Sequence, residues 1–107
     1  MQNVKFAAFF AAALALIAMP GSPVHAADAA HGRALAQRWC AACHVVSADQ
    51  KQASADAPPF ITIARSPISA QALAYFLLDP HPVMPTLPLS RIAADDIAAY
   101  IKSLKQQ

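Results

Sequence analysis

The sequence has 107 residues, which suits one ordinary domain and is too short for two. Hydrophobic residues make up 57% of the chain, and the formal net charge is only +2, with no run of basic residues. This balance argues against a nucleic-acid-binding protein, for which clustered lysine and arginine are expected. The apolar content is uneven, because much of it lies at the N-terminus.

The N-terminal region has the order of features that is typical of a secretory signal peptide. A short segment with one lysine precedes an uninterrupted apolar run over residues 6–18, and small residues follow it. The run has 13 residues, whereas a membrane-spanning helix needs about 20. We therefore predict a signal peptide that is cleaved after Ala26, with Ala27 as the alternative site, and that takes His25 with it. The mature domain then covers residues 27–107 in the bacterial periplasm, and an uncleaved membrane anchor is the alternative.

Three helical segments joined by proline-rich loops are expected in the mature part, so the predicted fold class is all-α. The first helix covers about residues 29–41 with Asp28 as its N-cap, the second lies within residues 67–79, and the last follows Ser90 to about residue 105. Apolar side chains recur in each at spacings of three and four. The residues expected on the inner faces include Gly32, Leu35, Ala36, Trp39, Ala70, Leu73, Phe76, Leu77, Ala93, Ile97, Tyr100, Ile101 and Leu104.

The most specific chemical signal is the motif Cys-x-x-Cys-His at residues 40–44. Two thiols at this spacing can each add across one vinyl group of a haem, and the following histidine then supplies an imidazole nitrogen to the iron. Cys40 and Cys43 are therefore the predicted thioether attachment points of one covalently bound haem c, and His44 is the predicted proximal axial iron ligand.

Two other interpretations of the cysteine pair are less well supported. A thioredoxin-like disulfide site would require a βαβ pattern, which the sequence does not show. A zinc site would require four ligands, and Cys40, Cys43 and His44 supply only three.

Met84 is the predicted distal axial iron ligand. It is the only methionine of the mature part, and it lies 40 residues after His44 in a stretch, residues 80–88, that contains four prolines. Because proline excludes a regular helix there, the thioether is expected on a stiff loop. His81 in the same loop is the alternative ligand, and core packing is the alternative role of Met84. His31 in the first helix is expected at the surface.

Taken in order, these features resemble the small bacterial class I c-type cytochromes over residues 28–105. A glycine-containing helix leads into the attachment motif, and Ala-Pro-Pro-Phe follows it at residues 57–60. Met-Pro follows a middle helix at residues 84–85, and Asp-Ile-Ala-Ala-Tyr-Ile at residues 96–101 is similar to the terminal helix of that family.

The resemblance implies roles for further residues. Gly32 would let the first and last helices cross closely, with Tyr100 packed over it. The backbone carbonyl of Pro58 would accept a hydrogen bond from the second ring nitrogen of His44 and so orient the ring, with Pro59 as the alternative.

The family also implies an electron carrier rather than an enzyme, with one haem iron cycling between the ferric and ferrous states. Expected partners are redox proteins: a dehydrogenase or cytochrome complex as donor and an oxidase or reductase as acceptor. Neither nucleic acid nor a stable membrane span is expected after cleavage, and the protein should be a monomer or form transient complexes. A dedicated cytochrome subunit of a periplasmic oxidoreductase, and a haem-based peroxidase or sensor with a displaceable sixth ligand, are the alternatives.

Overall fold

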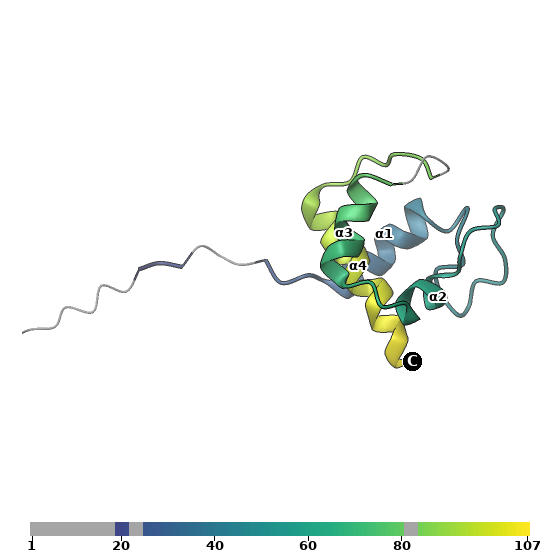
Figure 1. Ribbon diagram of the computed structural model, residues 1–107, viewed down its shortest axis with the longest axis horizontal. Helices are drawn as coiled ribbons and strands as arrows, with labels where there is room; N and C mark the ends of the chain where they lie inside the picture. Colours follow the sequence, from purple (N-terminus) through teal and green to yellow (C-terminus); the bar gives the residue numbers. More distant parts are fainter. Residues whose placement is uncertain (1–18, 22–24, 81–83) are drawn as a thin grey trace, which may run out of the picture.

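The computed structural model describes residues 19–21, 25–80 and 84–107. Within these ranges the chain forms four α-helices followed by a short 3-10 helix, and it contains no strand (Figure 1). The elements are α1 (Ala29–Trp39), α2 (Phe60–Arg65), α3 (Ala70–Leu78), α4 (Arg91–Ser103) and η1 (Leu104–Gln106). The all-α fold class predicted from the sequence is confirmed.

Most of the predicted signal peptide lies outside the described residues, so its cleavage stays a prediction. Of its last residues, His25 and Ala26 are described, and they lead directly into the N-terminus of α1. None of the helices in the described ranges has the length and apolar character that crossing a bilayer requires.

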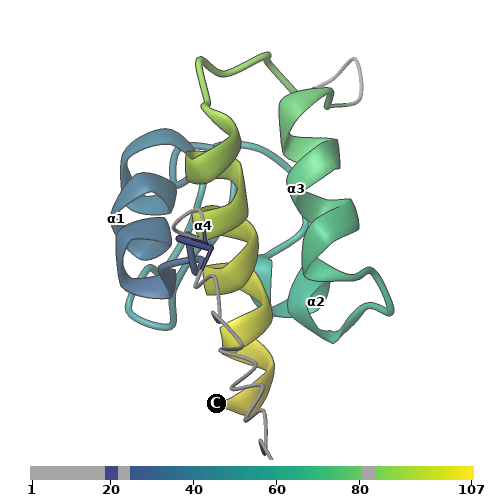
Figure 2. The ribbon, with the colours of Figure 1, turned by 90° about the vertical axis from the view of Figure 1, so that its left-hand side faces the viewer.

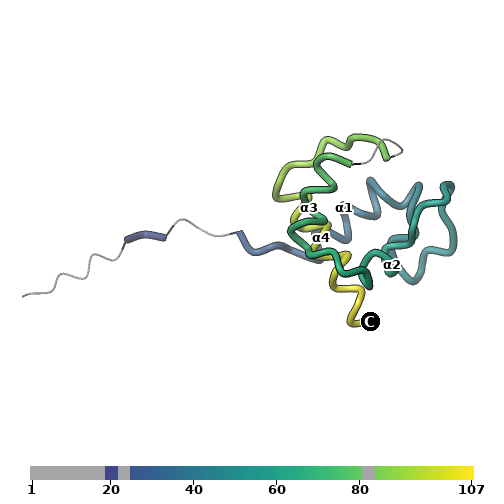
Figure 3. Tube along the Cα trace, viewed as in Figure 1, coloured from purple at the N-terminus to yellow at the C-terminus, as the bar shows by residue number. Residues whose placement is uncertain are grey.

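Helix α4 lies at the centre of the domain. Figure 2 shows α1 against one side of it and α3 and α2 on the other, and α1, α2 and α3 all contact α4, while α2 also contacts η1. Figure 3 follows the long connection from α1 to α2, residues 40–59, and the segment of residues 84–90 that leads into α4. The domain is therefore built around the C-terminal helix of the chain.

The three longer helices begin at side-chain caps. Asp28, Ser69 and Ser90 each accept hydrogen bonds from backbone amides two or three residues later, over 2.9–3.1 Å. These bonds satisfy amides that have no partner inside a helix, which is why short polar residues fix the helix starts. Asp28 is confirmed as the N-cap of the first helix, and Ser90 directly precedes the last helix as expected.

The helix ends differ from the predicted boundaries. α1 ends at Trp39 and not near residue 41, because residues 40–43 tighten into turns in which the carbonyl of Cys40 accepts the amide of His44 over 2.9 Å. Residues 60–65 form α2, which adds a short helix to the three predicted segments. The last helix changes to 3-10 geometry at Leu104.

The core is made mainly of the predicted inner faces. The buried members are Gly32, Ala36, Leu73, Leu77, Ile97, Tyr100, Ile101 and Leu104. Trp39 and Phe76 are the large exceptions, with 37% and 38% of their surface exposed. Trp39 is the last residue of α1, and the guanidinium carbon of Arg38 lies 5.0 Å from the centroid of its ring.

Helices α1 and α4 cross with their backbones in contact at Gly32. A Cβ atom at this position would overlap the carbonyl group of Asp96 and would lie only 2.9 Å from the amide nitrogen of Ile97. Only glycine fits such a crossing. One turn further along α4, the hydroxyl of Tyr100 donates to the carbonyl of Val46 over 2.6 Å and ties α4 to the segment after the cysteine motif.

Asp96 ties the start of α1 to the middle of α4. Its side chain is 1% exposed. Its Oδ1 accepts the amide of Asp28 and its Oδ2 lies beside Nδ1 of His31, each over 2.7 Å, while Nε2 of His25 lies 3.4 Å from Oδ1. His31 is at the surface as expected, with 52% of its side chain exposed, but this bond anchors its ring.

The pKa of Asp96 reflects two opposing causes. Burial of the carboxyl acts to raise its pKa, whereas the hydrogen bonds from His31, from the backbone of Asp28 and from His25 lower it. The hydrogen bonds prevail, and the pKa lies below its ordinary value of 3.8. The carboxylate is therefore the form that the folded domain stabilises.

Replacing Gly32 by alanine should destabilise the protein. Alanine favours an isolated helix over glycine by about 1 kcal/mol, but the overlap with Asp96 forces the two helices apart, and overpacking of this kind costs about 1–3 kcal/mol. Because the overlapping atoms belong to a helix backbone that cannot rotate away, we expect a net loss in the free energy of unfolding by guanidinium. Gln37→Ala, at an exposed position of the same helix, is the control and should be neutral or slightly stabilising.

The stabilisation from Asp96 should disappear in acid. Because its pKa is lower in the folded state than in the unfolded state, its contribution is full above about pH 4 and is lost as the pH falls through the folded pKa. The difference in Tm between the native protein and Asp96→Asn should therefore be large at pH 7 and shrink below about pH 4. Calorimetry of both proteins at several pH values from pH 7 to pH 2.5 measures this difference. A difference in Tm that stayed constant over this range would contradict the assignment.

Candidate functional site

The residues of the cysteine motif lie where α1 ends. The amide of Cys40 still bonds to the carbonyl of Ala36 over 2.8 Å, so the first cysteine continues the helix, and the turn that follows exposes Cys43 and His44 in part. Cys40 and Cys43 are not joined in a disulfide. Burial of the Cys40 thiol and, to a smaller extent, the neighbouring Cys43 raise the pKa of Cys40 to about 11.

One side chain, Gln50, holds the turn of the motif together. Its Oε1 accepts the amide of Val46 over 2.9 Å, while its Nε2 donates to the carbonyls of Ala41 and His44 over 2.8 and 2.9 Å. These bonds join both ends of the turn to a single amide group. Sequence reasoning missed Gln50, since it lies in a polar segment with no periodic pattern.

His44 is fixed by a hydrogen bond to the backbone. Its Nδ1 lies 2.7 Å from the carbonyl oxygen of Pro58, and its ring centroid is 5.4 Å from that of Phe60. A carbonyl can only accept, so Nδ1 carries the proton and Nε2 keeps a lone pair that is available to a metal ion. Pro59, the alternative partner in the sequence analysis, precedes α2 at its N-cap position.

The cysteines, His44 and Met84 line one large cavity of about 700 Å³. Its remaining wall is mostly apolar and comes from α2, α3, α4 and the two long connections. The lining residues are Cys40, Cys43, His44, Ala55, Asp56, Ala57, Pro58, Phe60, Thr62, Ile63, Ser66, Ile68, Leu73, Phe76, Leu77, Met84, Pro85 and Ile101. Cys40, Cys43, His44, Pro58 and Met84, the residues that the sequence analysis assigned to the site, therefore all lie around the same space.

Met84 reaches this cavity from the proline-rich connection between α3 and α4. It is partly buried and packs against the hydrophobic core, and Pro85 beside it lines the cavity as well. His81, the alternative ligand, lies outside the described residues.

The cavity fits a covalently bound haem. Its volume falls within the range of about 300–1,000 Å³ that is usual for cofactor sites. An apolar wall suits the porphyrin plate, two thiols stand at its edge, and one imidazole and one thioether offer the donor atoms that axial haem ligation uses. The polar side chains of Asp56, Thr62 and Ser66 add few charges to this lining.

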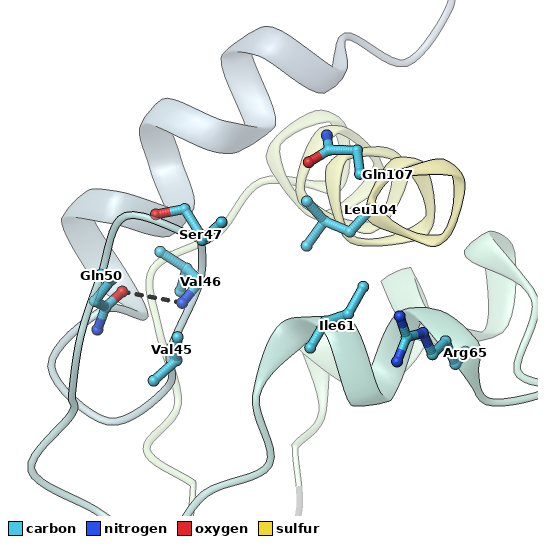
Figure 4. Close-up of a pocket in the computed structure, with 9 residues that line it drawn as sticks. Val45, Val46, Ser47, Gln50, Ile61, Arg65, Leu104 and Gln107 are labelled. Carbon is cyan, nitrogen blue, oxygen red and sulfur yellow. Dashed lines mark hydrogen bonds between the residues drawn. The ribbon is translucent and has the colours of Figure 1, made fainter.

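A second, smaller pocket of about 320 Å³ lies between the segment after the motif, α2 and the C-terminus. Figure 4 shows Ile61 and Leu104 facing this space, with Arg65 and Gln107 at one side and Gln50 bonded to Val46 at the other. It contains none of the residues that the sequence assigned to the site.

The chain is 59% identical to cytochrome c-552 of Bradyrhizobium diazoefficiens over 90 residues. The matched region covers 83% of this chain and 86% of that protein. No protein-family model matches the chain, and no solved structure matches it significantly. The similarity to the cytochrome thus extends over most of both sequences.

Replacing Gln50 by alanine should loosen the motif turn. Four backbone groups would lose this partner, and a buried group left unpaired costs about 1–3 kcal/mol. We expect a clear decrease in the midpoint of unfolding by guanidinium, measured on the haem-loaded protein through the absorbance of the haem. Gln52→Ala is the matched control, because the Gln52 side chain is exposed and only its backbone carbonyl is bonded to Gln50. Equal midpoints for the two variants would show that Gln50 does not support the turn.

Proposed function

This chain belongs to the small class I c-type cytochromes, and on that premise we propose that it is a periplasmic carrier of single electrons whose haem iron is ligated by His44 and Met84. As a member of this family it is an electron-transfer protein and not an enzyme, and its prosthetic group is covalently bound haem c with its iron. Its partners are redox proteins.

One observation carries the proposal: the thiols of Cys40 and Cys43, the imidazole of His44 and the thioether of Met84 all line the same cavity. We assign the two cysteines to thioether attachment, because they follow each other on one turn at the cavity edge. A set of two thiols, one imidazole and one thioether around an apolar space corresponds to attachment plus two axial ligands.

His44 is the proposed proximal ligand. The bond from its Nδ1 to the Pro58 carbonyl selects the tautomer with a lone pair on Nε2 and holds the ring in one orientation. A hydrogen bond to the nitrogen that faces away from the metal also makes the ligating nitrogen a stronger donor. Pro58 thereby acts through His44, and Gln50 steadies the same residue from its backbone side.

Met84 is the proposed distal ligand. A thioether binds iron weakly, so its place should be fixed by the surrounding chain, and the prolines on both sides limit the conformations of that segment. Methionine opposite histidine raises the reduction potential relative to two histidines. This choice of ligands favours acceptance of electrons from a dehydrogenase or cytochrome complex and delivery to an oxidase or reductase.

A bound haem would supply the one-electron chemistry between the ferric and ferrous states of its iron. The protein residues would hold it and keep water away: Phe60, Leu73 and Leu77 present apolar walls, and His44 and Met84 would both ligate the iron. No position is then left for a substrate, which agrees with a carrier and not a catalyst.

Export completes the proposal. A signal peptide over residues 1–26 directs the chain to the periplasm, and cleavage leaves 81 residues with seven basic and six acidic side chains. So little net charge gives weak electrostatic steering, and we expect apolar contacts around the haem edge, with a transient interface of less than about 1,200 Å².

Replacing Met84 by alanine tests the ligand assignment. The ferric wild-type protein should show a weak absorption band at roughly 695 nm from the iron–sulfur bond, and Met84→Ala should lose this band and have a lower potential, while the covalent haem remains. His81→Ala is the matched control from the same loop and should keep both the band and the potential. Absence of the band from the ferric wild-type protein, with a changed spectrum and potential in His81→Ala but not in Met84→Ala, would reverse the assignment.

A further inference from the structure

The carboxylate of Asp96 lies against the point where the mature chain is expected to begin. We propose that removal of the signal peptide creates a new partner for this side chain: the α-ammonium group of the mature protein binds the Asp96 carboxylate and fastens the start of the chain to α4. The inference rests on the cleavage proposed above, but not on the haem ligands.

The site on Asp96 is built from buried polar contacts. The side chain is 1% exposed, Oδ2 lies 2.7 Å from Nδ1 of His31, and Oδ1 accepts the amide of Asp28 over 2.7 Å. A carboxylate buried to this extent needs hydrogen bonds or an opposite charge to offset the loss of hydration. Oδ1 can take a further partner besides the amide of Asp28, since Nε2 of His25 also lies 3.4 Å from this atom.

Cleavage would exchange one partner of Oδ1 for another. His25 precedes both expected cleavage sites and leaves with the signal peptide, so its contact belongs to the precursor alone. The residue that becomes N-terminal gains a positive charge in the same step. The precursor contact thus marks a position near Asp96 that the mature terminus can take over.

Covalent geometry places the new ammonium close to Asp96 for either site. After cleavage at Ala26 the charged nitrogen belongs to Ala27, and three bonds separate it from the amide nitrogen of Asp28, a span of at most about 3.6 Å. After cleavage at Ala27 the charged nitrogen is that of Asp28 itself, which already lies 2.7 Å from Oδ1. Ala27 is exposed, so the ammonium can approach without displacing core side chains.

The neighbouring charges favour this pairing. The Asp28 carboxylate accepts amides of α1 and adds negative charge beside the terminus. On α4, Arg91 lies 3.3 Å from Asp95 and so has its own acidic partner. From α1 only His31 faces the Asp96 carboxylate, and it is bound to the other oxygen. The cation expected at Oδ1 is therefore the terminal ammonium.

The pairing should raise the pKa of the terminal amine. An α-amino group ordinarily titrates near about pH 7.7–8.0, and an opposite charge at a few ångströms shifts a pKa by about one to three units. Because the cation is favoured in the folded state, the stabilisation is present below the unfolded pKa and is lost as the pH rises through the folded pKa.

The test uses the mature haem-loaded protein purified from the periplasm. Its intact mass first decides whether and where cleavage occurs, and an uncleaved chain would overturn the inference without touching the haem assignment. The amines are then labelled by reductive ¹³C-methylation, and their pKa values are measured by NMR on the reduced, diamagnetic protein. We expect the terminal amine to titrate about one unit or more above its ordinary value.

Two variants separate the pairing from a general effect of the fold. In Asp96→Asn the pKa of the terminal amine should return to its ordinary value, and in Asp95→Asn, which removes the neighbouring exposed carboxylate, it should stay raised. If Asp96→Asn does not fold, insertion of Gly-Ser between Ala26 and Ala27 moves the ammonium away and leaves the core intact. An ordinary pKa in the native protein, or a raised one that persists after the insertion, would overturn the proposal.

Discussion

The structure depends on the contact between α1 and α4 at Gly32. Because no side chain separates the two backbones there, the direction of α1 relative to α4 is fixed, and the C-terminal end of α1 delivers Cys40 to the cavity. Two polar bonds reinforce the same crossing from its two sides: Asp96 holds the start of α1, and Tyr100 holds the segment after the motif through Val46. One helix crossing therefore positions both the cysteine motif and the segment that precedes α1.

Around the cavity, hydrogen bonds from side chains to the backbone fix the positions of the site residues. Gln50 gathers the carbonyls of the motif turn, and the Pro58 carbonyl orients His44. The ammonium of Lys102 donates to the carbonyls of Ala64 and Ser66 over 2.9 and 3.0 Å and secures the end of α2. A carrier benefits from such bracing, because a site that keeps its shape in both oxidation states needs little rearrangement when an electron moves.

The features that could be predicted are local ones. The attachment motif and the three side-chain caps depend on residues a few positions apart, and the helix stripes follow from spacing alone. Gln50 and Asp96 escaped prediction because their partners are backbone groups or residues brought near only by the fold: Asp96 reaches an amide 68 residues earlier in the chain. Trp39 and Phe76 satisfied the helical spacing but are partly exposed, because α1 ends before Trp39 can be covered and Phe76 faces the cavity.

The distance along the sequence between α1 and α4 has a consequence for how the protein is made. Bringing together residues 54 to 68 positions apart closes a long loop, whose entropic cost must be met before the contacts it allows can stabilise the domain. In the proposed export, in which the N-terminus crosses the membrane first, the two cysteines would emerge before the last helix. Because α1 packs on α4, it would lack its packing surface until then, and the thiols would stay accessible for the proposed attachment of haem.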